Sequence, residues 1–339
     1  MRYAPPPPME LHRPTGRWRL GLLLASTTAL LWGVLPLPLL LVLRDLDPLT
    51  LTWYRFLIAA LVLGAALGWR GELPELGGLS LGRGWPLLAV ATVSLATNYY
   101  WFLLGLDQTN AATAQVLIQL APMLLALGGL FIFGEHFSRL QWLGFAVLIG
   151  GFSLFFGDQL RLLAASADRY LFGALTMLGA AVTWAVYGLA QKQLLRWLPS
   201  QGIMLCIFGG CTLLFYPVSD PVALLDLDAP GLWLLLFCSL NTVVGYGAFA
   251  EALLHWEASR VSAVLSMTPL ATLGFLWLAH AFLPDLLEPQ PITVLGVLGA
   301  CVVVVGASMM SLGGGADLST GESPSEGQVE HLSAGAKRS

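Results

Sequence analysis

Residues 108–134 read QTNAATAQVLIQLAPMLLALGGLFIFG, a run of 27 amino acids without Asp, Glu, Lys or Arg. A helix needs about 20 mainly apolar residues to cross the hydrocarbon core of a bilayer. Lipid offers the backbone no hydrogen-bond partner, so a segment there must be a helix or part of a closed barrel. Barrel strands alternate in polarity over about ten residues, and this run does not. We therefore predict a transmembrane helix.

Similar runs fill most of the chain. Eight further stretches lack charged residues, and a ninth, 48–69, holds Arg55 alone. The eight are 20–43, 84–106, 140–157, 170–191, 197–219, 229–250, 261–284 and 289–316. Together with 108–134 they make ten predicted spans. The expected fold class is therefore all-α integral membrane, with ten transmembrane helices.

The composition excludes several classes of soluble protein. Only 11% of residues are charged and 57% are apolar, whereas a soluble domain carries about a quarter charged residues. The net charge of −4 and the lack of a basic stripe exclude a nucleic-acid binder. The sequence holds no Walker loop, zinc-ligand spacing or GxSxG motif, and its four cysteines and five histidines are scattered. We expect no enzyme, no metal and no cofactor.

Basic residues are divided unequally between the predicted loops. With the N-terminus in the cytoplasm, the inner loops carry 12 of them and the outer loops three, Arg44, Arg161 and Arg169. The positive-inside rule then predicts that both termini are cytoplasmic. The chain divides into a cytoplasmic N-terminal segment (1–19), two five-helix halves (20–157 and 169–312) and a cytoplasmic tail (313–339). The Gly/Ser/Glu-rich composition of that tail predicts disorder.

The two halves repeat each other weakly. The matched pairs are Trp32 and Trp184 at an offset of 152, and Tyr99 with Tyr246 and Pro122 with Pro269 at an offset of 147. Five spans in each half force opposite orientations, which predicts two inverted five-helix repeats. Such repeats are typical of secondary transporters whose site lies between the halves near the midplane. A few identities in a Leu- and Ala-rich chain also arise by chance, and that alternative stays open.

Polar residues inside the spans mark a candidate substrate cavity, because a polar side chain in lipid is costly unless it faces protein or water. Gln115, Gln119 and Pro122 share one helix face, and the repeat sets Ser262, Ser266 and Pro269 against them. The other candidates are Asn98, Tyr99, Asn241, Tyr246, Trp32 and Trp184. Aromatic rings could clamp a substrate, and both prolines predict helix kinks. Helix–helix hydrogen bonding, an interfacial aromatic belt and simple packing remain the alternatives.

Three charged residues are candidates for gating. Arg55 lies within a predicted span, so it is either a topology or packing anchor or a cation that binds an anion or gates. Glu135 and Arg139, one turn apart at the inner end of the fourth span, predict a loop or gate salt bridge. Carboxylates and histidines fall near span ends, Glu251 at the inner one. We therefore expect the substrate's own gradient, or exchange, to drive transport.

Several short motifs occur together in a fixed order. They are Gly21 followed by Leu31-Trp32-Gly33, the Trp-Tyr-Arg-Phe stretch at 53–56, Ala111-Ala112, Pro122, Gly134-Glu135, Gln141-x-x-Gly144 and Gly150-Gly151. With these motifs the chain resembles, over about 17–312, the EamA modules of the drug/metabolite transporter superfamily. The second module departs from the pattern, since Phe282 stands at the position matching Glu135. The resemblance implies a multi-pass transporter of a bacterial-type inner membrane that exports an amino acid or similar metabolite.

The expected function is therefore secondary transport of a small polar or amphipathic metabolite by alternating access. The expected partners are the lipid bilayer and a small-molecule substrate, with no nucleic acid; a homodimer is left open. A non-transporting scaffold is one alternative, and Gly64-x-x-x-Gly68 would offer it a small-residue face. A membrane-embedded lipid enzyme is another, but it would need facing intramembrane carboxylates or histidines.

Overall fold

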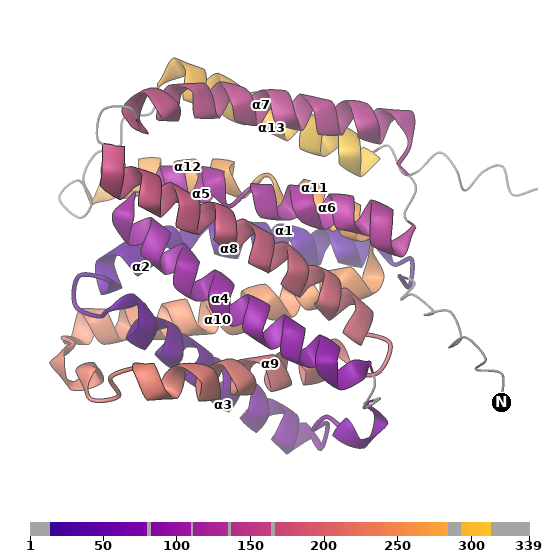
Figure 1. The fold of residues 1–339 in the computed structure, drawn as a ribbon, viewed down its shortest axis with the longest axis vertical. Coiled ribbons are helices and arrows are strands. Elements are labelled where there is room, and N and C mark those ends of the chain that lie inside the picture. Colours follow the sequence, from indigo (N-terminus) through magenta and orange to yellow (C-terminus); the bar gives the residue numbers. More distant parts are fainter. Residues whose placement is uncertain are drawn as a thin grey trace, which may run out of the picture.

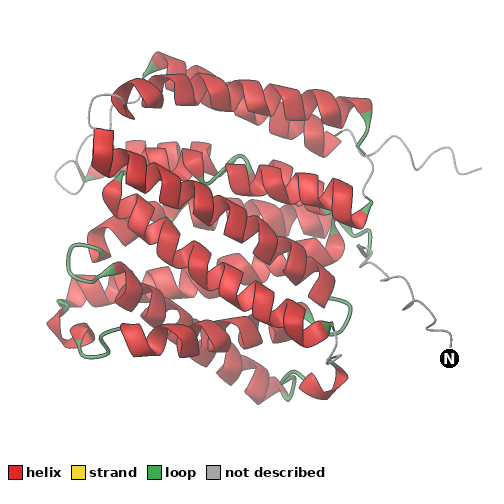
Figure 2. Cartoon of the chain, in the orientation of Figure 1, coloured by secondary structure: helices red, strands yellow, loops and turns green. Residues whose placement is uncertain are grey.

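The computed structural model describes residues 14–79, 83–109, 111–134, 137–163, 167–283 and 293–312. Within these ranges every regular element is a helix (Figure 2). Most of the predicted segment 1–19, all of the tail 313–339, and Glu135 of the expected Glu135–Arg139 salt bridge lie outside the described residues.

The helices follow one another in a simple order. They are α1 (Trp18–Val34), α2 (Pro36–Val42), α3 (Pro48–Arg70), η1 (Leu76–Gly78), α4 (Gly84–Gln108), α5 (Ala111–Leu117), α6 (Leu120–Phe133), α7 (Arg139–Leu163), α8 (Ala167–Leu194), α9 (Ser200–Phe215), η2 (Tyr216–Val218), η3 (Ala223–Asp226), α10 (Ala229–His255), α11 (Ala258–Leu265), α12 (Thr268–Phe282) and α13 (Val294–Leu312).

Seven helical stretches of the described chain are long and apolar enough to cross a membrane. They are Trp18–Val42, Pro48–Arg70, Gly84–Gln108, Leu171–Leu194, Ser200–Val218, Ala229–His255 and Ala258–Phe282. Shorter apolar helices, Leu120–Phe133, Arg139–Leu154 and Val294–Gly306, occupy the remaining three predicted positions. Large apolar side chains face outward, with Phe131 77% and Leu213 76% exposed, as expected where the surrounding solvent is lipid. The protein is thus an all-helical, multi-pass membrane protein.

The sequence fixes where several helices begin and end. The Asp47 carboxylate accepts hydrogen bonds from the backbone N–H of Leu49 (2.9 Å) and Thr50 (3.1 Å), which caps the first turn of α3. Asp228 caps α10 in the same way through the N–H of Gly231 (2.8 Å). At the other end of α3, Gly71 adopts φ +68°, the left-handed conformation that glycine adopts without steric cost.

The helices lie side by side and run between the same two ends of the molecule (Figure 1). Their closest pairings join elements far apart in sequence: α4 with α8, α1 with α10, α3 with α9, and α7 with α13. In Figure 1, α7 and α13 form the upper edge, α3 and α9 lie at the lower edge, and α1, α4, α8 and α10 fill the centre.

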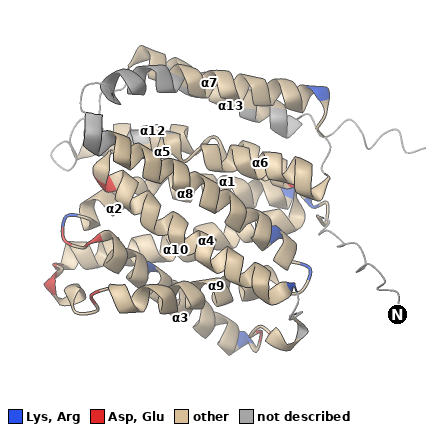
Figure 3. Cartoon of the chain, viewed as in Figure 1, with Lys and Arg blue, Asp and Glu red and all other residues tan. Residues whose placement is uncertain are grey.

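Charged residues gather at the two ends of the helices (Figure 3). Most Lys and Arg residues lie at the end where α4 and α7 begin and α3 and α8 finish, which we call the basic end. Most Asp residues lie in the loops at the opposite end. Between the ends the helix surfaces are almost free of charge, and Arg55 of α3 is an exception that points inward, with only 2% of its surface exposed.

Candidate functional site

Three of the apolar helices are interrupted between their ends. Leu35 separates α1 from α2, residues 118–119 separate α5 from α6, and residues 266–267 separate α11 from α12. Pro36, Pro122 and Pro269 each lie within the first turn of the second half. Proline has no N–H, so the carbonyl four residues earlier loses its usual helical donor.

Each of those three carbonyls is hydrogen-bonded in another way. The Gln115 side-chain amide donates to the Trp32 carbonyl (3.1 Å), and the Thr268 hydroxyl donates to the Leu265 carbonyl (2.6 Å). The Ile118 carbonyl accepts from the backbone N–H of Ala121 (2.8 Å). Since an unpaired buried carbonyl costs about 1–3 kcal/mol, these bonds make the interruptions stable parts of the fold.

Side chains from three helices meet the carbonyl end of α1. Besides Gln115 of α5, Asn241 of α10 donates through Nδ2 to the Leu31 carbonyl (2.7 Å). The Thr272 hydroxyl of α12 donates to the Gly33 carbonyl (2.8 Å). The end of α1 is therefore held to both halves of the chain.

A cavity of about 80 Å³ lies where the three interruptions meet. Trp32, Ile118 and Leu265, whose carbonyls the prolines release, all line it. The cavity therefore suits a small molecule, held next to the backbone of the interrupted helices.

Aromatic rings from four helices form much of the cavity wall. The ring centroid of Trp32 (α1) lies 5.6 Å from that of Trp184 (α8) and 4.8 Å from that of Tyr246 (α10). Tyr99 (α4) lies 5.5 Å from Tyr246. Trp32 fits because α10 carries Gly245 beside it: a Cβ there would lie 2.7 Å from the indole Nε1.

Most of the predicted candidates come together in this cavity. Those that line it are Trp32, Arg55, Asn98, Tyr99, Gln115, Gln119, Pro122, Trp184 and Tyr246. Their helices are the continuous α3, α4, α8 and α10 and the interrupted pairs α1/α2 and α5/α6. Asn98 also donates from Nδ2 to the Ala180 carbonyl of α8 (2.9 Å), so it joins two helices as well as facing the cavity.

Five other candidates lie elsewhere. Asn241 is buried and hydrogen-bonded to the end of α1, and Pro269 lies in the first turn of α12 without lining the cavity. Ser262 and Ser266 are buried, and Ser266 donates its hydroxyl back to the Ser262 carbonyl (2.9 Å). Arg139 is exposed at the start of α7, at the basic end. The short serine side chains occupy the repeat-equivalent position, while their neighbours Leu265 and Thr268 line the cavity.

Sequence reasoning missed several residues that shape this site. Thr242 contacts Arg55, Thr272 holds the Gly33 carbonyl, and Phe102 lines the cavity. Threonine hydroxyls in helices commonly bond to a carbonyl of the preceding turn. A threonine that also contacts another helix therefore cannot be recognised from the sequence. The Pro36-x-Pro38 spacing was a usable signal for the first interruption.

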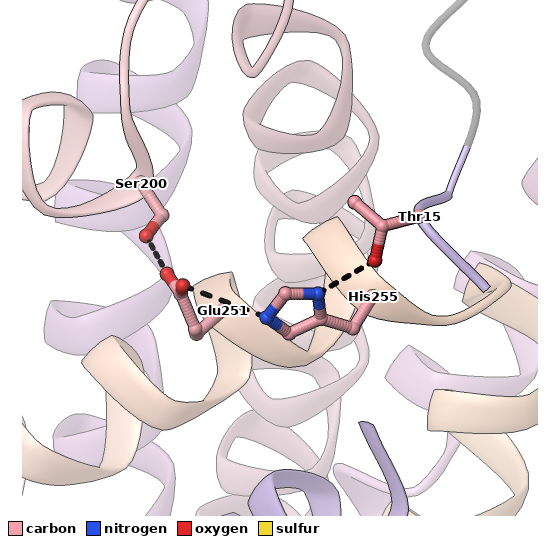
Figure 4. Close-up of polar contacts among 4 residues, drawn as sticks. All are labelled: Thr15, Ser200, Glu251 and His255. Carbon is pink, nitrogen blue, oxygen red and sulfur yellow. Dashed lines mark hydrogen bonds and ion pairs between the residues drawn. The ribbon is translucent and has the colours of Figure 1, made fainter. Parts of the chain in front are cut away.

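A second polar cluster lies at the basic end (Figure 4). The Ser200 hydroxyl at the start of α9 donates to the Glu251 carboxylate of α10. Glu251 Oε1 lies 3.7 Å from His255 Nε2, and His255 Nδ1 is hydrogen-bonded to the Thr15 hydroxyl (2.8 Å). These contacts tie the chain just before α1 to the ends of α9 and α10. Among the described residues no cluster of His, Cys, Asp or Glu could hold a metal ion.

Interrupted apolar helices around a cavity are typical of multi-pass membrane transport proteins. The family model described as "EamA-like transporter family" matches residues 19–157 and again 171–312. The chain therefore belongs to the EamA-like transporter family, and the predicted resemblance is confirmed.

Named relatives support this placement. The chain is 39% identical over 294 residues to "Uncharacterized inner membrane transporter YhbE" of Escherichia coli K12, covering 87% of this chain and 92% of that protein. It is 35% identical, over 87% of this chain and 95% of the other, to an "Uncharacterized transporter" of Haemophilus influenzae. A solved crystal structure shares the fold at a TM-score of 0.62 and 21% identity, covering 87% of this chain and 98% of that one. The protein is a multi-pass transporter of the inner membrane.

Proposed function

We propose that the protein is a ten-span secondary transporter that exports a small polar or amphipathic, amino-acid-like metabolite by alternating access. The observation that carries this proposal is the cavity itself, because interrupted helices from both halves of the chain surround it. Rocking of the halves about these interruptions would open the cavity first to one side of the membrane and then to the other. A scaffold protein would have no use for such a cavity.

The pairing of helices supports an inverted repeat. In ten-span numbering, α1–α10 joins spans one and eight, and α4–α8 joins spans three and six. If spans one to five repeat as spans six to ten, span one corresponds to span six and span three to span eight. The repeat therefore converts the pair of spans one and eight into the pair of spans six and three. It also relates α3 to α9 and α7 to α13, which pair with each other. The two matches to one family model, one in each half, agree with this arrangement.

The orientation and substrate class rest on charge and on a relative. The basic end would face the cytoplasm under the positive-inside rule, with both termini there. The chain is 23% identical over 295 residues to a protein of E. coli K12 named "Probable amino-acid metabolite efflux pump". The described residues that line the cavity include no carboxylate or histidine to carry a proton. Exchange, or the substrate's own gradient, therefore supplies the energy.

A comparison of secreted metabolites tests the proposal. Cells that lack the protein, overproduce it, or overproduce the Gln119→Leu variant would be profiled for metabolites inside and outside. Gln119 lines the cavity and is 2% exposed, so the variant should insert normally but export poorly. Gln201→Leu, an exposed position at the start of α9, is the matched control. Overproduction should raise the external level of a small amphipathic metabolite, and an unchanged profile would contradict the proposal.

A further inference from the structure

Arg55 is a buried cation whose role transport alone does not explain. It lies in α3, is 2% exposed and lines the cavity. An arginine at the centre of a membrane-spanning helix costs about 2.5–3.5 kcal/mol on insertion scales. Such residues persist where they face a protein interior or a water-filled cavity and pair with another charged residue or with backbone carbonyls.

The groups that hold Arg55 are neutral. Its Nε donates to the Thr242 hydroxyl (3.2 Å), and that hydroxyl in turn donates to the Cys238 carbonyl (2.9 Å). The guanidinium carbon lies 4.6 Å from the ring centroid of Tyr99. These contacts fix the plane of the guanidinium group without neutralising its charge.

Within the described chain, no carboxylate forms an ion pair with Arg55. The hydrogen bond that the guanidinium makes to a described residue comes from Nε, so the terminal N–H groups have no described protein acceptor. A planar guanidinium with both terminal groups free matches a carboxylate, which it binds through two parallel hydrogen bonds.

A second observation also points to a ligand. The Gln119 side-chain oxygen is buried, lines the same cavity and has no hydrogen-bond partner among the described residues. It can accept one N–H or O–H from a bound molecule. The rest of the wall is largely apolar, and part of it is aromatic: the Trp32 ring contacts the rings of both Trp184 and Tyr246.

We propose that Arg55 binds the carboxylate of the transported molecule, so that the cavity selects organic carboxylates with an apolar or aromatic body over their neutral analogues. The Gln119 oxygen accepts a hydrogen bond from a donor elsewhere on the same molecule. This inference rests on the proposed function, since it names the ionic group by which the substrate is held.

Binding to the full-length protein in lipid nanodiscs tests the inference. The probes are 3-phenylpropionate and 3-phenylpropionamide, which share a body and differ in charge, and isothermal titration calorimetry gives their affinities. Wild-type protein should bind the acid at least about tenfold more tightly than the amide, the equivalent of ~1.4 kcal/mol. Arg55→Met should bind both about equally, by losing affinity for the acid alone. Arg70→Met, an exposed position on the same helix, should keep the preference.

Binding of the amide shows that a variant still forms the cavity. If Arg55→Met no longer binds the amide, Arg55→Lys is measured instead. Lysine keeps the positive charge but cannot form two parallel hydrogen bonds to a carboxylate, so the preference for the acid over the amide should fall several-fold. An unchanged preference in these variants, or a wild-type protein that binds neither probe or both equally, would overturn the inference. Binding of chloride or phosphate at Arg55 without binding of 3-phenylpropionate would also overturn it. Export from cells tests the proposed function separately from these binding measurements. If the cells still export a metabolite but the purified protein shows no preference for the acid over the amide, the proposed function stands and the inference about Arg55 is wrong.

Discussion

Gln115 shows how one side chain can connect the fold to the cavity. Its amide donates to the Trp32 carbonyl, which Pro36 leaves without a helical donor, and its side chain lines the cavity. Gln115→Leu should therefore lower stability by about 1–3 kcal/mol and reduce export strongly. Thermal unfolding of the purified protein and export from cells measure the two effects.

Gln141 provides the control for that prediction. Its side-chain oxygen accepts from the Ser138 N–H (2.9 Å), while the Ser138 hydroxyl accepts from the Gln141 N–H (3.2 Å), a capping box at the start of α7. Gln141→Leu should cost about 0.5–2 kcal/mol and leave export per folded molecule intact. Equal loss of export in both variants would show that Gln115 acts through stability alone.

Gly245 sets the position of the Trp32 ring. A methyl group at this position would lie 2.7 Å from Trp32 Nε1, so Gly245→Ala must displace the indole. We expect a stability loss of about 1–3 kcal/mol from overpacking, together with reduced export. At Gly247, on the same helix, a Cβ would meet no atom within 4 Å, so Gly247→Ala should fold and transport normally. The same assays apply, and wild-type behaviour of Gly245→Ala would contradict the packing described for the cavity.

For single residues, the sequence indicated which polar side chains are candidates for the cavity better than it indicated which residues they contact. Gln115 and Gln119 stood out because amides are rare in an apolar run, and both line the cavity. Ser262 and Ser266 were expected there by repeat symmetry, but symmetry relates backbone positions and not side-chain reach. The partnership of Arg55 with Thr242 spans 187 residues of sequence, and no local pattern encodes it.

Among the helices, the interruption between α1 and α2 provides the sharpest test. Pro36→Ala restores an N–H that can bond to the Trp32 carbonyl and join the two helices into one. We expect unfolding stability to be maintained or raised, while export falls several-fold because the Trp32 carbonyl would bond within the helix instead of holding the Gln115 side chain at the cavity. Pro48→Ala, at the first residue of α3 where no helical bond is missing, should export normally. Full export by Pro36→Ala would mean that this interruption is not required.

The sequence predicted two of the three interruptions. Pro122 and Pro269 follow polar residues on one helix face, and that pattern predicted kinks at the two places where the structure interrupts the helical hydrogen bonding. The intervening residues Gln119, Ser266 and Met267 keep helical dihedral angles. The break at Leu35 was not predicted, because residues 20–43 satisfy the length of a single span so well. Hydropathy measures the length of a span, whereas the N–H missing from proline decides whether the span is continuous.

For the whole molecule, the loop charges predict orientation. Reporter fusions after Ser339 should give a cytoplasmic signal, and fusions after Asp228, in the loop before α10, should give a periplasmic one. The reason is that basic residues gather at one end and acidic residues at the other (Figure 3). The reverse pair of signals would invert the proposed orientation, and two signals from one compartment would contradict ten spans.

Composition and apolar run length were enough to predict an all-helical membrane protein. The structure pairs helices that are far apart in sequence: α4 with α8, α1 with α10, α3 with α9 and α7 with α13. The surfaces of these helices are mostly apolar. Because the long described helices are apolar around most of their circumference, a single sequence does not indicate which of them touch. The position of the cavity follows from those pairings, and only the structure supplies it.

Alternating access requires that the cavity can be reached from both sides of the membrane. Ile118 lines the cavity at the α5–α6 interruption, so Ile118→Cys would be introduced after Cys206, Cys211, Cys238 and Cys301 are replaced by alanine. A membrane-impermeant maleimide would then be applied to right-side-out and to inside-out vesicles. Leu225→Cys, 80% exposed in η3, is the control that should react from one side only. Alternating access predicts that Ile118→Cys reacts from both sides, and labelling from one side only would contradict it.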